Sequence, residues 1–208
     1  MSRKIEGLLE KAALITNSSD DEMSSVASAK RNYSNAFEAE NFFVKFKEKL
    51  FQIRKWNALS GLSSYELFDA NGNVCKRETT IVGDFIRITL HGSGMSDWVR
   101  VVNIDEDSDE IILTVQPTYN PTEETPDAGF TSHFFTAEST NNFCLQKTGE
   151  TINFYVVGLH EKSNTEDTKN IIETVRNVAT ANLGHYLGIQ KGEWTTFCEN
   201  FLESKGKE

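Results

Sequence analysis

Cysteine and proline are both scarce in this 208-residue chain, which contains three of each. Cys75, Cys144 and Cys198 are odd in number and far apart, so their spacing argues against a disulfide framework and against a Cys-rich zinc site. We expect all three thiols to be reduced and packed as small hydrophobic groups, with Cys75 the most exposed. The fold must then rest on packing rather than on cross-links.

Long apolar segments are missing as well. No hydrophobic run approaches the roughly 18 residues that span a bilayer. The N-terminal residues carry charges on both sides of their leucines, so they lack the uninterrupted apolar core of a secretory signal. We therefore expect a cytoplasmic protein with no membrane partner.

Positive charge is in deficit. The chain has 21 Lys and Arg against 31 Asp and Glu, a formal net charge of −10. Between Arg100 and Lys147 there is no Lys or Arg, whereas the same stretch holds nine acidic residues. Because nucleic-acid binding depends on Lys and Arg contacts to phosphates, we expect no nucleic-acid partner for this acidic protein. The acidic stretch either forms a solvated surface that aids solubility or orients a basic partner.

Sequence motifs of common active sites are also missing. The chain contains no GxGxxG, GxxxxGK[ST], GxSxG or HExxH pattern. Its four histidines do not have the spacing of a metal site. His91 and His160 each end a predicted strand, and they could converge for acid–base or metal chemistry if those strands are neighbours. We predict no cofactor, no metal and no catalytic residue, and the absence of motifs favours a non-enzymatic protein.

The N-terminal part of the chain reads as a helix followed by a linker. Residues 1–16 have apolar side chains at helical spacing, and residues 17–33 are polar and rich in serine. The helix is therefore either a loosely tethered arm or an element that docks on the body or on a second copy. We assign residues 34–203 to a single α+β domain and 204–208 to a polar tail.

Within the domain, residues 35–57 are predicted to form a helix with Ser34 as its N-cap, ending before Ser60. The next hundred residues alternate as short strands with hairpin-like links, which implies antiparallel pairing. The predicted strands are Tyr65–Phe68, Val74–Thr80, Asp84–His91, Asp97–Ile104, Glu110–Gln116, Phe143–Lys147 and Thr151–His160, and Phe134–Ala137 is a candidate for an additional one.

The C-terminal region is predicted to contain two helices. A capping-box pattern at Ser163–Glu166 precedes an amphipathic segment whose end is marked by Gly184 and Gly188. A final short helix begins near Gly192 and presents one apolar stripe.

The element order defines the α+β class: an antiparallel, twisted sheet of about seven strands, with N-terminal helices and a C-terminal helix pair packed on it. In element order alone, the layout loosely resembles helix-grip and other sheet-plus-helix ligand-binding folds. Such a resemblance does not determine function.

Five residues are candidate binding residues. Trp98 and Arg100 share one face of a strand, either as a binding cluster or as part of a sheet face with Val102 and Ile104. Residues 117–132 hold all three prolines, and this loop is either a lid or a plain crossover. The other candidates are Tyr119 and His133, in or beside the loop, and His160 at a strand end.

Two functions are compatible with these features. The first is a non-catalytic binding or protein-interaction domain for an unknown protein partner, with homodimer formation through the N-terminal helix as one form of it. The alternative is a protein or enzyme that binds a small apolar molecule in a pocket between the sheet and the C-terminal helix, gated by loop 117–132, with Tyr119 and His133 at its mouth.

Overall fold

The computed structural model describes residues 3–16, 23–91, 96–124, 131, 133, 135–162 and 183–203, with the side chains of 183–191 excepted. Seven strands form one antiparallel sheet in the order β1-β7-β6-β5-β4-β3-β2. The elements are α1 Lys4–Thr16, β1 Met23–Asn32, α2 Ala36–Phe51, the 3-10 helix η1 Ile53–Ala58, β2 Ser63–Phe68, β3 Phe85–Leu90, β4 Ser96–Glu106, β5 Glu110–Pro117, β6 Thr140–Thr148, β7 Thr151–Glu161 and α4 Leu183–Leu202.

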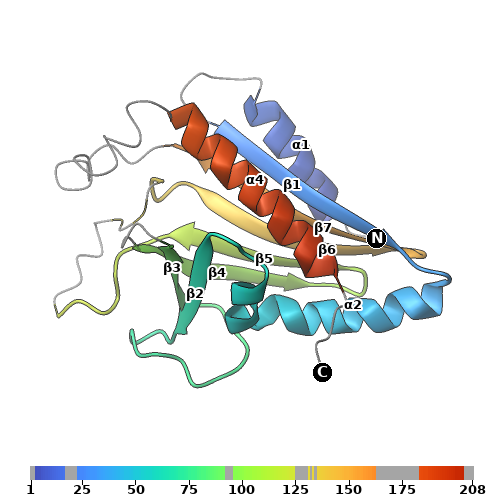
Figure 1. Cartoon of the computed structure of the whole chain (residues 1–208), viewed down its shortest axis with the longest axis horizontal. Helices are drawn as coiled ribbons and strands as arrows, with labels where there is room; N and C mark the ends of the chain where they lie inside the picture. The colour runs from blue at the N-terminus through green and yellow to red at the C-terminus, as the bar shows by residue number, and fades with distance from the viewer. Residues whose placement is uncertain are drawn as a thin grey trace.

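Helices lie on both faces of this sheet, and the predicted α+β class is confirmed (Figure 1). We call the face that packs against α2, η1 and α4 the inner face. The opposite face, which packs against α1, is the outer face. Because side chains alternate along a strand, neighbouring residues such as Phe143 and Cys144 enter different layers of the core.

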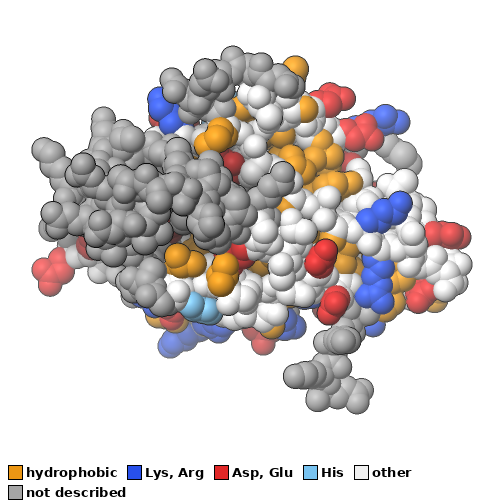
Figure 2. Space-filling model, turned by 45° about the horizontal axis from the view of Figure 1, so that its top comes forward, with side chains coloured by type: hydrophobic (Ala, Val, Ile, Leu, Met, Phe, Trp, Pro, Cys, Tyr) orange, Lys and Arg blue, Asp and Glu red, His pale blue; other side chains and the backbone are white. Residues whose placement is uncertain are grey.

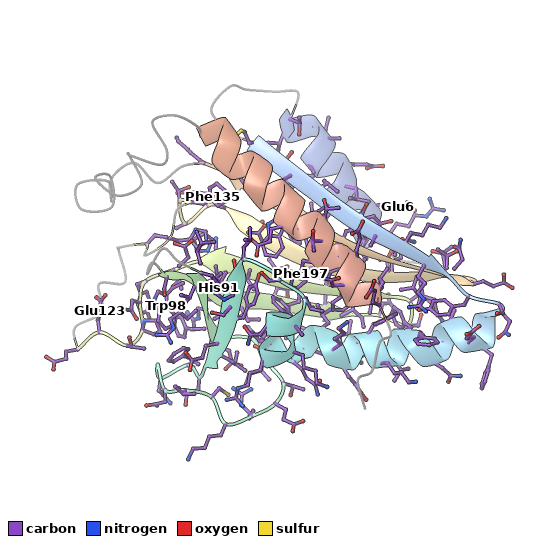
Figure 3. The ribbon with its side chains drawn as sticks, in the orientation of Figure 1. Glu6, His91, Trp98, Glu123, Phe135 and Phe197 are labelled. Carbon is purple, nitrogen blue, oxygen red and sulfur yellow. The ribbon has the colours of Figure 1, made fainter. Side chains whose placement is uncertain are left out.

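The inner layer is filled largely by aromatic side chains. Phe197 lies in the C-terminal half of α4 (Figure 3) and contacts the rings of Trp56 and Phe143. One turn further on, Phe201 stacks on Phe154 with ring centroids 3.8 Å apart. The predicted apolar stripe of the last helix is therefore the surface that packs on the sheet.

The N-terminal helix α1 packs on the outer face of its own sheet. Ile5, Ala12 and Ile15 are buried against a group of residues from β5, β6 and β7: Ile112, Cys144, Val157 and Leu159. Lys4 adds a backbone N–H bond to the Glu110 carboxylate and an ion pair with Asp105 at 2.6 Å. Of the alternatives for this helix, the structure shows docking on the body.

The predicted linker is wrong for residues 23–32, which form strand β1 at one edge of the sheet. The strand pairs with β7 from Met23 to Asn32, and its Ala27 side chain is buried in the inner layer. A serine-rich composition is typical of loops. An edge strand needs only a few apolar side chains, however, because one of its sides faces solvent.

The predicted strand Val74–Thr80 is also wrong. Only Val74 forms an isolated bridge, with Phe68. The following residues form a loop around the buried carboxylate of Asp84, which pairs with Arg77 at 2.6 Å and accepts a hydrogen bond from the backbone N–H of Ile81 at 2.8 Å. Cys75 is buried in the inner layer, so its predicted exposure is wrong as well.

Three other element boundaries differ from the prediction. Phe134–Ala137 contributes no strand among its described residues. The N-cap of α2 is Asn35, whose side chain accepts from the N–H of Glu38 at 2.9 Å. Helix α4 runs without a break through Gly184 and Gly188, since a helical glycine costs only about 1 kcal/mol.

The capping box and the first C-terminal helix, residues 163–182, lie outside the described residues. Within the described ranges, none of the helices combines the length and the apolar composition that crossing a bilayer requires.

Candidate functional site

Three of the five candidate residues meet on the outer face, beside β2 and β3. Trp98 is buried in a small cluster with Phe68 and Phe85. Tyr119 packs edge-on against Phe85, and the guanidinium of Arg100 lies over the same ring, 5.4 Å from its centroid. The sequence thus identified residues that do come together, in a compact cluster with a cation stacked on it.

The prediction that Val102 and Ile104 continue the sheet face of Trp98 and Arg100 along β4 is wrong. A β-bulge interrupts the register between Val101 and Asn103. The extra residue turns the strand over, so Ile104 packs in the inner layer while Trp98 faces outward.

The first half of loop 117–132 does not gate the inner face. Tyr119 packs on the outer face, and the carbonyl of Pro121 lies against Gly72, where no side chain would fit. Tyr119 therefore lies on the side opposite α4, and residues 125–130 are outside the described part.

The three histidines whose side chains the structure describes do not form one group. His133 is buried, and its Nδ1 accepts from the N–H of Phe135 at 2.9 Å. Burial lowers the pKa of His133, which keeps the imidazole neutral at physiological pH. His91 follows β3 and His160 lies in β7, and three strands separate β3 from β7. The conditional convergence of His91 and His160 therefore fails.

His160 has a structural effect that the sequence did not reveal. Its φ of 54° is left-handed, and it coincides with a register shift in which Met23 pairs with Glu161 but Ser25 pairs with Gly158. The bulge turns the Glu161 side chain back over the inner face, where its carboxylate contacts Gly158. A methyl group at Gly158 would collide with Oε1 of Glu161, so glycine is what makes room for the carboxylate.

The Glu161 carboxylate is almost completely buried, with 1% of the residue exposed. The Ser25 hydroxyl donates a hydrogen bond to its Oε1 at 2.9 Å. Burial raises the pKa of Glu161 to about 7, and the bond from Ser25 offsets only part of this effect. Glu161 is therefore a carboxyl group that exchanges its proton near neutral pH.

Asn141 lies on the strand beside Gly158, the residue that the Glu161 carboxylate contacts. It is paired directly with Gly158 in the β6–β7 register, and directly opposite side chains have Cβ positions about 5 Å apart. Asn141 is only 7% exposed, and its Oδ1 has no hydrogen-bond partner among the described residues.

Helix α4 supplies a second polar atom of the same kind. Trp194 is 9% exposed, and within the described part of the chain its indole Nε1 also has no partner. The Trp194 ring packs edge-on against Phe143, with centroids 5.6 Å apart. Phe143 is two residues from Asn141 on the same face of β6. We call Ser25, Asn141, Glu161 and Trp194 the inner-face polar site.

The side chains of this site come from four elements, β1, β6, β7 and α4. The inner-face polar site offers a carboxyl group, an amide oxygen and an indole N–H between the sheet and α4. The nearby thiol of Cys198 has its pKa raised to about 12 by burial, so it is not a thiolate nucleophile at neutral pH. No cluster of three metal-ligating side chains occurs among the residues that the structure describes.

None of the four polar-site residues was a candidate from sequence. By simple alternation, Glu161 would point to the face opposite Gly158, and only the bulge reverses it. The one usable signal was Gly158, a glycine inside an apolar strand, which often marks a close approach.

Fold and site together describe an α+β protein with a group of buried polar side chains on the sheet face that α4 covers. No family model matches the sequence, and no curated protein matches it either.

Several solved structures share the general layout. A hypothetical protein, jhp0584, from Helicobacter pylori aligns at 8% identity over 86% of each chain, with a TM-score of 0.48. A truncated norcoclaurine synthase from Thalictrum flavum aligns at 9% identity over 91% of this chain and 98% of its own, with a TM-score of 0.42. A major latex-like protein from Panax ginseng aligns at 13% identity over 77% and 98%, with a TM-score of 0.36. Likenesses this distant identify no function.

Proposed function

We propose that this protein is a non-catalytic binding protein for a small, largely apolar molecule, held between the inner face of the sheet and α4. The observation that carries the proposal is a pair of polar atoms that have no hydrogen-bond partner among the described residues, Asn141 Oδ1 and Trp194 Nε1, each on a residue that is less than one-tenth exposed. A ligand with a few polar groups on an apolar body would give both atoms a hydrogen-bond partner.

Energetics support this proposal. Leaving a buried polar atom without a hydrogen bond costs about 1–3 kcal/mol, and apolar residues of similar shape would avoid that cost. Asn141 and Trp194 bear this cost beside Glu161, whose buried carboxyl group costs further free energy when ionised. Polar groups set into an otherwise apolar layer are the usual composition of a small-molecule site.

The surroundings of the site are apolar. In the same row as Asn141, the neighbouring strands contribute Val115 and Val101 to the inner layer. Phe143 and the Trp194 ring border the next row. A ligand would therefore bury its hydrocarbon part against aliphatic and aromatic side chains and direct its polar atoms toward β7.

The structure removes the main argument for the competing hypothesis, in which the N-terminal helix is a tethered arm that binds a partner. The apolar stripe of α1 is already buried on its own sheet, so it is not free for a partner or a second copy. Some hydrophobic surface remains, including Leu14 and Val26, and Figure 2 shows exposed hydrophobic side chains on the face turned forward. These side chains are exposed individually in the manner of ordinary surfaces.

A fluorescent apolar probe tests the proposal. N-phenyl-1-naphthylamine is titrated into the full chain, and the emission of the bound probe is followed. We expect saturable binding that weakens at least about tenfold in Asn141→Leu, which fills the site with an apolar side chain. Asn103→Leu is the matched control, because Asn103 is an exposed residue of β4, which β5 separates from β6, and this variant should bind as the wild type does. Equal binding by all three proteins, or none by the wild type, would contradict the proposal.

A further inference from the structure

The inner-face polar site has an excess of hydrogen-bond acceptors. A carboxylate has about four lone-pair positions, and the Ser25 hydroxyl is the donor that the structure shows on Glu161. The neighbouring Oδ1 of Asn141 is a further acceptor, without a partner among the described residues. A ligand group that donates several hydrogen bonds therefore matches this part of the site best.

The charge of Glu161 has no counter-ion in the described part of the chain. None of the ion pairs formed by described residues includes it. Residues 101–146 contain no Lys or Arg. This range includes all of β5 and most of β4 and β6. A buried carboxylate without a cation is costly, so a cationic ligand would gain from supplying one.

Aromatic side chains add to the same preference. Trp194 and Phe143 pack together on the inner face beside Asn141. A cation near the face of an indole or phenyl ring is attracted by the ring quadrupole, most strongly where water is excluded. The net charge of −10 further favours the approach of cations.

We propose that the inner-face polar site binds a primary or secondary ammonium group on an apolar body, with the ammonium seated between Glu161 and Asn141. This inference rests on the proposed binding function and specifies the chemical class of the ligand. The Trp194 N–H is a donor, so it would pair with an acceptor atom elsewhere on the natural ligand.

Binding of a cation is then linked to the proton on Glu161. The free protein holds that proton up to about pH 7, and the ammonium requires the ionised carboxylate. Amine affinity should therefore rise about a hundredfold between about pH 5 and pH 8, with one proton released on binding below pH 7.

Other titratable groups lie on the described elements packed around the site. His133 is held neutral by burial. Glu138 titrates below its ordinary range, because hydrogen bonds lower its pKa. The remaining charged or titratable groups there are Asp97, His160, Lys162 and Glu193, and none of them forms a described ion pair with Glu161.

The experiment is calorimetric titration of the full chain with 4-phenylbutylamine and with its neutral isostere 4-phenylbutan-1-ol. We expect the amine to bind at least about tenfold more tightly than the alcohol at about pH 8. In Glu161→Gln the preference should disappear. In Glu150→Gln, the same substitution at an exposed turn residue, it should remain.

A second measurement does not depend on any variant folding. Titrations of the wild type near pH 6 in two buffers of different ionisation enthalpy should show proton release with the amine and none with the alcohol. Equal affinity for both probes without proton release would overturn the ammonium inference and leave the binding function intact. Failure of both probes to bind would contradict the binding function itself.

Discussion

At the scale of single residues, Glu161 and Gly158 determine the arrangement of the polar site. The carboxylate lies on the inner face because His160 is left-handed and because Gly158 carries no side chain. Neither condition follows from the residue pattern of β7, which reads as an ordinary alternating strand. A side-chain direction that depends on one bulge is beyond what periodicity can predict.

The first prediction concerns the pH dependence of stability. The pKa of Glu161 is about 7 in the folded protein and 4.5 is its ordinary value, so the folded state binds the proton more tightly. The stability gained from this proton is complete below about pH 4.5 and is lost as the pH rises through about 7, a change of about 3 kcal/mol.

Urea unfolding of the wild type and of Glu161→Gln, at intervals between about pH 4.5 and pH 8, measures this contribution. The difference in unfolding free energy between the two proteins should change by about 3 kcal/mol in favour of the variant as the pH rises. A difference that stays constant across the range would show that Glu161 titrates normally.

The second prediction concerns Gly158. An added methyl group would meet the carboxylate of Glu161 and the hydroxyl of Ser25. Gly158→Ala should therefore lower the unfolding free energy by about 1–3 kcal/mol, the usual cost of overpacking, and lower the pKa of Glu161 by pushing it toward solvent. Thermal unfolding and a carboxyl titration followed by NMR report the two effects.

Gly7→Ala is the matched control for that substitution. A methyl group at Gly7 meets no atom within 4 Å, and alanine favours a helix by about 1 kcal/mol over glycine. Gly7→Ala should stabilise the protein or leave it unchanged. If the two glycine variants behaved alike, Gly158 would have no special role.

At the scale of elements, the placement of α1 carries the third prediction. Ile5 is fully buried on the outer face, whereas Leu14 of the same helix is 70% exposed. Ile5→Ala should cost about 2–4 kcal/mol of stability, and Leu14→Ala less than about 0.5 kcal/mol.

Hydrogen exchange distinguishes docking from a free arm. In the wild type, the amides of α1 should be protected, and in Ile5→Ala they should exchange faster while α2 remains protected. Rapid exchange of α1 in the wild type would mean that the helix leaves the sheet in solution. That result would support the hypothesis that the protein forms a homodimer through α1.

The elements that sequence predicted best are those whose periodicity and packing agree. The stripe of α4 and the alternation of β3 led directly to buried faces, because Phe197 and Ile86 point where their spacing indicates. The sequence did not predict β1, because small polar residues dominate this strand. It wrongly predicted a strand at Val74–Thr80, because β-forming residues there belong to a loop that bonds to the Asp84 carboxylate. In both cases tertiary contacts outweighed local propensity.

At the scale of the whole molecule, the class of fold followed from the short links between strands, which permit only antiparallel pairing. The layer that each helix occupies did not follow. The spacing of Ile5, Ala12 and Ile15 indicates one buried face but does not say which sheet face receives it. Among the described helices, α4 is the one that packs against both β1 and β7 on the inner face, where the polar site lies.

The candidate site also shows what the sequence could predict and what it could not. Sequence alternation placed Trp98 and Arg100 on one face of a strand, and the structure adds Tyr119, which the sequence had grouped with His133. The inner-face polar site combines residues from β1, β6, β7 and α4, as far apart as Ser25 and Trp194. Only the complete sheet register brings those four elements into one place.

Native mass spectrometry of the purified full-length chain tests the central claim, that the inner-face polar site holds a small molecule. The account predicts an adduct of constant mass that survives gentle ionisation, disappears on denaturation and is lost or reduced in Asn141→Leu but kept in Asn103→Leu. A spectrum of the bare chain that stays unchanged after incubation with 4-phenylbutylamine, 4-phenylbutan-1-ol or N-phenyl-1-naphthylamine would contradict it.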